Sequence, residues 1–105
     1  MDAFNKEVLG ESRPVLVLCM HRDSEFQEQT DVVEGVCRTY GEKLKAFLMD
    51  EEFIGAFREN FEVKGTPTFM IFIGGAEKGR MLGQTDQKAL EDFVSRTLSL
   101  DQEGK

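Results

Sequence analysis

The stretch that most constrains the fold is Val63–Gly75, where Pro67 stands directly before an unbroken apolar run. Proline cannot donate a hydrogen bond to a sheet ladder, so it fits at the first residue of a strand. The run Phe69–Ile73 contains no polar residue, which is typical of a strand buried on both faces. Gly74 and Gly75 then suit the tight turn of a hairpin. The sequence therefore predicts a central strand entered through Pro67, with an antiparallel strand after it.

Strand-like and helix-like segments alternate along the rest of the chain. Further strands are predicted at Val15–Met20, Leu44–Met49 and Lys78–Leu82. Helices are predicted at Phe4–Leu9, from Asp23 or Ser24 to Gly41, from Asp50 to about Asn60, and from Thr85 or Asp86 to about Leu98. This order predicts an α/β domain over residues 1–100, with a central mixed sheet and helices on both faces. Residues 101–105 are predicted to form a polar C-terminal tail.

Composition narrows the classes of partner. The formal net charge is −7, and such an acidic chain is unsuited to nucleic acid and to anionic membranes. No segment is apolar enough to span a membrane, and the first residues lack the features of a secretory leader. The spacing of Cys19 and Cys37 matches neither a metal pair nor a disulfide framework. We therefore expect a cytoplasmic protein that holds no metal and no cofactor and binds neither nucleic acid nor membrane.

The Thr66-Pro67-Thr68 opening resembles the thioredoxin superfamily, and the order of segments from Val15 to about Leu98 follows the same pattern. The resemblance implies a thioredoxin-like fold in which the Thr66–Pro67 bond is cis and faces the active site. The family usually carries a strand before its first helix, and this chain begins after that position. We therefore expect a four-stranded sheet without the family's N-terminal strand, in which Leu44–Met49 lies at an edge.

The residues that carry the family's chemistry are absent. Thioredoxins hold a Cys-x-x-Cys at a helix N-terminus, where the pKa of the first thiol is lowered. The ungapped match puts Asp23-Ser24-Glu25-Phe26 on these positions. It also puts Val17 and Leu48 where the family has a buried acid and a nearby lysine. The resemblance therefore implies a member without disulfide oxidoreductase activity, and we favour a protein that is not an enzyme.

One capability of the family needs no cysteine. The backbone beside the family's cis-proline pairs with an extended substrate peptide, through main-chain hydrogen bonds. Our leading interpretation is thus a protein- or peptide-binding module. Its groove would be formed by Arg22, Asp23, Ser24, Glu25, Thr66 and Pro67. The alternative reading of Pro67 is that it only shapes the start of its strand.

Two other functions stay open at this stage. Cys19 lies near the end of a buried strand, where it is either a packing residue or the reactive thiol of an oxidoreductase or redox sensor in cell redox homeostasis. The predicted edge strand Leu44–Met49 exposes unpaired backbone groups and could join a second copy in a homodimer. Lys43 and Lys45 offer some protection against such pairing. We expect Phe47→Lys to leave a monomer folded and to dissociate an edge-paired dimer.

Overall fold

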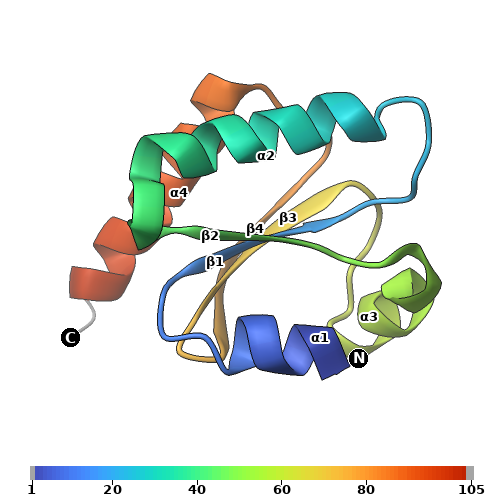
Figure 1. Ribbon diagram of the computed structural model, residues 1–105, viewed down its shortest axis with the longest axis horizontal. Coiled ribbons are helices and arrows are strands. Elements are labelled where there is room, and N and C mark those ends of the chain that lie inside the picture. Colours follow the sequence, from blue (N-terminus) through green and yellow to red (C-terminus); the bar gives the residue numbers. More distant parts are fainter. Residues whose placement is uncertain (1, 104–105) are drawn as a thin grey trace.

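The computed structural model describes residues 2–103 and contains a four-stranded mixed sheet with helices on both of its faces (Figure 1). In chain order the elements are α1 (Asp2–Phe4), the π-helical turn η1 (Asn5–Leu9), β1 (Val15–Cys19), α2 (Phe26–Tyr40), the 3-10 turn η2 (Gly41–Lys43), β2 (Lys45–Leu48), the 3-10 turn η3 (Glu51–Phe53), α3 (Ile54–Asn60), β3 (Thr68–Ile73), β4 (Ala76–Leu82) and α4 (Gln87–Glu103). The predicted α/β class and the four strands are confirmed.

The strands lie in the order β2-β1-β3-β4, so β1 and β3 are central. β1 runs parallel to β2 and antiparallel to β3, while β3 and β4 form an antiparallel hairpin. Both central strands are covered on two faces, which explains why their sequences are unbroken apolar runs. The hairpin turn uses Gly74 and Gly75 at φ values of 60° and 83°, the left-handed region that glycine adopts without a steric penalty. The strand predicted after Pro67 and the hairpin after it are therefore confirmed.

Two cores lie on the two faces of the sheet, because side chains of a strand alternate between its faces. α2 and α4 cover one face, and α1, η1 and α3 cover the other (Figure 1). The core under the short helices, here called the aromatic core, consists of Phe4, Val8, Val15, Val17, Cys19, Phe47, Met49, Ile54, Phe57, Val63, Met70 and Phe72, with Phe53 and Phe61 at its margin. The core on the other face, here called the α2–α4 core, contains Leu16, Leu18, Met20, Val33, Val36, Leu44, Phe69, Ile71, Leu90, Phe93 and Val94.

The last helix is longer than the sequence predicts. Asp86 accepts a hydrogen bond from the Ala89 amide at 2.8 Å and so caps the helix start, as expected. At the other end α4 continues through Glu103, so the prediction of a polar tail is wrong for residues 101–103. The Asp101 carboxylate lies 3.4 Å from the Lys78 ammonium of β4, and this contact holds the last turn against the sheet. Residues 104–105 lie outside the described part of the chain.

β2 lies at an edge of the sheet, as predicted. The prediction for Phe47→Lys, however, is wrong. Phe47 is 9% exposed, and its ring centroid lies 5.9 Å from that of Phe4 in α1. A lysine at this position would place an unpaired charge in the aromatic core, which is costly. The sequence pattern did not reveal that the N-terminal helix covers this face of β2.

Candidate functional site

The candidate site lies at the end of the sheet where β1 stops and β3 starts. Cys19 pairs with Thr68 in the antiparallel register, so the loop after β1 and the segment before β3 leave the sheet at the same end. The Gly83 amide donates a hydrogen bond to the Pro67 carbonyl at 2.8 Å, which brings the end of β4 to this place as well. Figure 1 shows the loop from β1 rising here into α2. The two segments that we predicted to form a groove are therefore neighbours.

The segment before β3 is held by its flanking residues. The Thr66–Pro67 bond is cis, as predicted, and Pro67 is buried while Thr66 is half-buried. The buried Thr68 hydroxyl donates a hydrogen bond to the Gly65 carbonyl at 2.6 Å. Among residues 2–103, no hydrogen bond engages the backbone N–H or C=O of Thr66. A main-chain donor and acceptor are thus available at this position.

The loop between β1 and α2 is a tight, exposed turn that carries carboxylates. The Asp23 amide donates to the His21 carbonyl at 2.8 Å, and the Glu25 amide donates to the Asp23 carboxylate at 3.0 Å. The Ser24 hydroxyl donates to the Glu25 carboxylate at 2.9 Å. Asp23, Ser24 and Glu25 are all exposed at the start of α2. These positions thus present oxygen atoms, and no sulfur, toward the solvent.

Arg22 folds back over the beginning of α2. Its guanidinium carbon lies 4.1 Å from the centroid of the Phe26 ring, and its Nη1 donates to the Met20 carbonyl at 3.0 Å. A cation stacked on an aromatic face is attracted by the ring quadrupole. The positive charge of Arg22 is therefore held beside the loop, over the first residue of α2.

A contact between His21 and Glu51 joins this loop to η3, and we did not predict it. His21 Nδ1 lies 2.9 Å from Glu51 Oε2, and the Arg22 amide donates to Glu51 Oε1 at 3.4 Å. The hydrogen bond with His21 holds the pKa of the Glu51 carboxyl below its usual value. From the sequence, the acidic run Asp50-Glu51-Glu52 is predicted only to start a helix. No spacing in the sequence connects it with His21. This pair sets the position of the loop from outside the predicted groove.

The two cysteines do not take part in the site. Cys19 is fully buried in the aromatic core, and burial raises its pKa to about 11. Cys37 is half-buried beside the α2–α4 core, and burial together with Glu34 raises its pKa to about 11. Both thiols are free and lie on opposite faces of the sheet, so the structure holds no disulfide between them. Cys19 therefore lacks the exposure and the low pKa of a reactive thiol.

Val17 and Leu48 are also on opposite faces. Val17 is in the aromatic core, whereas Leu48 packs at the margin of the α2–α4 core. The parallel register pairs Val17 with Phe47, so Leu48 is one residue out of step with it. Our expectation that these two positions replace a neighbouring acid and lysine is therefore wrong for Leu48.

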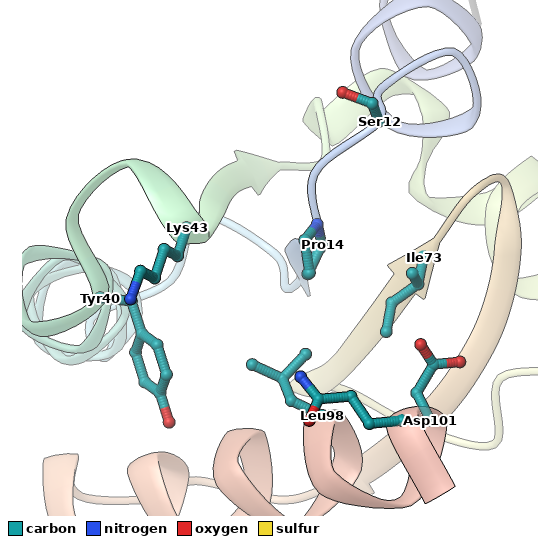
Figure 2. A pocket seen from close by; sticks show the side chains of 8 residues that line it. Ser12, Pro14, Tyr40, Lys43, Ile73, Leu98 and Asp101 are labelled. Atoms are coloured by element: carbon teal, nitrogen blue, oxygen red, sulfur yellow. The ribbon is translucent and has the colours of Figure 1, made fainter. Parts of the chain in front are cut away.

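A separate hollow of about 470 Å³ opens at the opposite end of the sheet, before β1 starts and where β3 ends (Figure 2). It is lined by Ser12, Pro14, Tyr40, Lys43, Ile73, Leu98, Asp101 and Gln102. Tyr40 and Lys43 stand on one side, and Ile73, Leu98 and Asp101 on the other (Figure 2). These residues come from four distant stretches of sequence, so no local motif predicts the hollow. Its one carboxylate, that of Asp101, is engaged by Lys78.

Residues 2–103 contain neither a cluster of metal ligands nor a membrane-spanning helix. No three histidine, cysteine, aspartate or glutamate side chains gather closely enough there to hold a metal ion. No helix in that range is both long and apolar enough to cross a membrane. The chain matches no model of a known protein family, and no curated protein matches it.

Proposed function

We propose that the chain is a thioredoxin-like domain without dithiol chemistry that binds a protein or an extended peptide. The groove would run between the loop Arg22–Glu25 and the pair Thr66-Pro67. The observation that carries this proposal is the pairing of Cys19 with Thr68, since it puts both segments at one end of the sheet. The free backbone N–H and C=O of Thr66 supply the means of binding.

Binding would proceed by a short strand addition. A peptide lying beside Thr66 would accept a hydrogen bond from its N–H and donate one to its C=O, so affinity comes from the main chain. Selectivity comes from the side chains of the loop. The exposed carboxylates of Asp23 and Glu25 favour a peptide that carries lysine or arginine next to its extended stretch. Arg22, stacked on Phe26, would border the same loop.

Thiol chemistry at Cys19 has less support as the function. A thiol with a pKa of about 11 is almost entirely protonated near neutral pH, and the thiolate is the nucleophile in disulfide exchange. We expect no reduction of insulin disulfides above the uncatalysed rate. Turnover that disappears in Cys19→Ser would contradict this expectation and would favour the thiol function.

An array of short peptides with graded charge tests the proposal, followed by titration of the isotope-labelled protein with the best peptide. We expect the amide resonances of Thr66 and Arg22–Glu25 to shift, and basic peptides to bind more tightly than acidic ones. Thr66→Trp should abolish binding because the indole fills the groove. Ser99→Trp is the matched control, because Ser99 is exposed on α4, away from this end of β3.

The location of the shifts decides the outcome. Shifts confined to the groove that vanish in Thr66→Trp and persist in Ser99→Trp support the proposal. An array without any binding peptide, or shifts that cluster around the hollow near Tyr40 and Leu98, would overturn it.

A further inference from the structure

The outer edge of β2 carries backbone groups without partners. The Lys45 amide donates to the Pro14 carbonyl and the Met49 amide to the Leu18 carbonyl, both at 3.0 Å, so these residues face β1. Backbone groups of alternate residues in a strand point to opposite sides, and hence Ala46 and Leu48 face outward. β2 is the edge strand, so no strand of the described chain pairs with this side of it.

The lysine that could protect this edge is turned away from it. Lys45 Nζ donates to the Glu7 carbonyl at 3.0 Å and lies 3.6 Å from the Glu11 carboxylate, so its charge is held under η1. Its side chain is only 22% exposed. A charged side chain that projects from an edge strand is a common defence against pairing with another chain. β2 lacks this defence along its length.

The other edge of the sheet, β4, is protected against pairing with a further strand. β4 carries Lys78 and Arg80, which pair with Asp101 and Glu77 but keep 40% and 37% of their side chains exposed. A register shift between Ile71 and Phe72 also distorts its ladder with β3. Charges and bulges of this kind prevent a further strand from pairing. The two edges therefore differ in kind, and β2 is the one that can accept a strand.

Apolar side chains adjoin the open edge. Ala46 and Leu48 are half-buried at the margin of the α2–α4 core, together with Val32 of α2. A strand added to β2 would cover the parts of these side chains that still face water. The gain from covering apolar area would then add to the hydrogen bonds of the ladder.

The charges at the two ends of β2 are complementary when the added strand is antiparallel. Lys43 stands before β2, and the acidic run Asp50-Glu51-Glu52 follows it. A second copy in antiparallel orientation would bring its acidic end to Lys43 and its own Lys43 to the acidic run. A parallel copy in register would instead put the acidic runs side by side.

We propose that β2 joins two copies of this chain, pairing antiparallel with β2 of the partner around a twofold axis at Phe47. Ala46 would then stand opposite the partner's Leu48, and each pair would exchange hydrogen bonds in both directions. Such an interface uses the same surface on both copies, so the dimer closes and leaves neither β2 edge exposed. This inference is independent of the peptide groove at Thr66.

Sedimentation and hydrogen exchange of the chain 1–105 test the dimer together. We expect a species of twice the 11.9 kDa chain mass that dissociates on dilution. Amides of Ala46 and Leu48 should exchange slowly at high concentration and rapidly at low concentration. Those of Lys45 and Phe47, which face β1, should stay protected throughout.

Two variants probe the contacts. Ala46→Pro removes an outward N–H without touching the ladder to β1, and it should give a monomer. Because proline could also disturb folding, a charge reversal provides the second route. Lys43→Glu should weaken dimerisation by about three- to tenfold, and adding Asp50→Lys should restore it.

Several results would overturn the dimer. One is a chain that stays monomeric up to millimolar concentration, and another is an oligomer in which Ala46 and Leu48 still exchange rapidly. Failure of Asp50→Lys to rescue Lys43→Glu would contradict the antiparallel arrangement. Protection that appears only when an unfolded polypeptide is added would assign the edge to a peptide instead of a second copy.

Discussion

The two faces of the sheet are covered in different ways. On one face α1, η1 and α3 are short, and α3 has only 7 residues. On the other face α2 and α4 have 15 and 17 residues. Helices as short as those of the first face have little stability of their own, so they depend on what they pack against. The short helices on the first face therefore depend on packing against the aromatic core. The long helices on the other face have a clear amphipathic periodicity in their own sequences.

The aromatic core supplies what the short helices lack. The Phe4 ring lies edge-on to four others, with centroid distances of 5.9 Å to Phe47, 5.3 Å to Phe57, 5.7 Å to Phe61 and 5.5 Å to Phe72. Edge-on aromatic pairs contribute beyond the area that they bury. One residue thus joins α1, β2, α3 and β3. This concentration of contacts makes the face sensitive to a single side chain.

The α2–α4 face is held at more separate points. Its core is mostly aliphatic, and the buried Gln29 adds a polar attachment. The Gln29 side chain donates to the Thr85 carbonyl at 3.1 Å and accepts from the Thr85 amide at 2.9 Å. It thereby joins α2 to the loop before α4.

Phe4→Ala should have the largest effect. Removing the ring leaves a cavity among four others, and we expect a loss of about 3–5 kcal/mol in the free energy of unfolding. Hydrogen exchange should also show that residues 2–9 detach before the sheet unfolds. Leu90→Ala is the control on the other face, where α4 should stay protected. Equal protection of residues 2–9 in the wild type and Phe4→Ala would contradict the dependence of this face on one ring.

Gln29→Leu should have the next largest effect. The substitution leaves the N–H and C=O of Thr85 without their partner in a partly buried place, which costs about 1–3 kcal/mol. Gln27→Leu is a matched control, because Gln27 is exposed on the same helix and donates a hydrogen bond to Asp31 of that helix. Urea denaturation of both variants measures the difference. If Gln27→Leu lowers the free energy of unfolding as much as Gln29→Leu does, the hydrogen bonds to Thr85 contribute no specific stability.

Gly79→Ala tests how closely α4 approaches the sheet. A Cβ at Gly79 would lie 3.0 Å from the Thr97 hydroxyl and 3.3 Å from the Phe93 ring, so these side chains of α4 must give way slightly. We expect a loss of about 1 kcal/mol, at the lower end of the cost of overpacking. Gly55→Ala on the other face is the counterpart, since nothing lies within 4 Å of its Cβ position. It should stabilise α3 by about 0.5–1 kcal/mol. Thermal melts of the two variants should therefore shift in opposite directions.

The alkylation rates of the two cysteines measure how readily the core on each face of the sheet becomes accessible. Cys37 is half-buried and should react slowly with iodoacetamide, whereas the fully buried Cys19 should react only as the aromatic core opens. Both pKa values are raised to about 11, so alkylation of Cys37 should accelerate as the pH rises toward that value. Mass spectrometry of peptides after timed alkylation measures both rates. Faster labelling of Cys19 than of Cys37 in the native protein would contradict this order.

The smallest expected effect is the loss of stability at low pH that comes from Glu11, which follows η1. Hydrogen bonds from the Arg13 side chain and amide lower the Glu11 pKa from 4.5 to about 2. A carboxyl whose pKa is lower in the folded state stabilises the fold above its unfolded pKa, and this contribution is lost as the pH falls through the lowered value. The carboxyl carbon resonance of Glu11 should therefore titrate well below those of other glutamates. In Arg13→Ala the Glu11 carboxyl should titrate at a higher pH, because the side-chain hydrogen bonds are lost while the amide of residue 13 still donates to it.

Much of this architecture was predictable because it depends on local sequence. The apolar runs of β1 and β3, the glycines of the hairpin and the Asp86 cap all act within a few residues of themselves. The adjacency of Arg22–Glu25 and Thr66-Pro67 followed from the strand order that the resemblance implied. His21–Glu51, by contrast, joins residues 30 positions apart without any pattern in the sequence.

The sequence by itself determined the helices and strands, their order and the absence of a thiol in the loop Arg22–Glu25. These features depend only on residue type and on the spacing of neighbouring residues. Tertiary structure alone decided which side chains share a face. It buried Phe47 under Phe4, separated Val17 from Leu48, drew the Lys45 ammonium toward η1 and extended α4 through Glu103. Each of these results depends on where an element that is distant in the sequence packs. Local residue preferences do not determine that position.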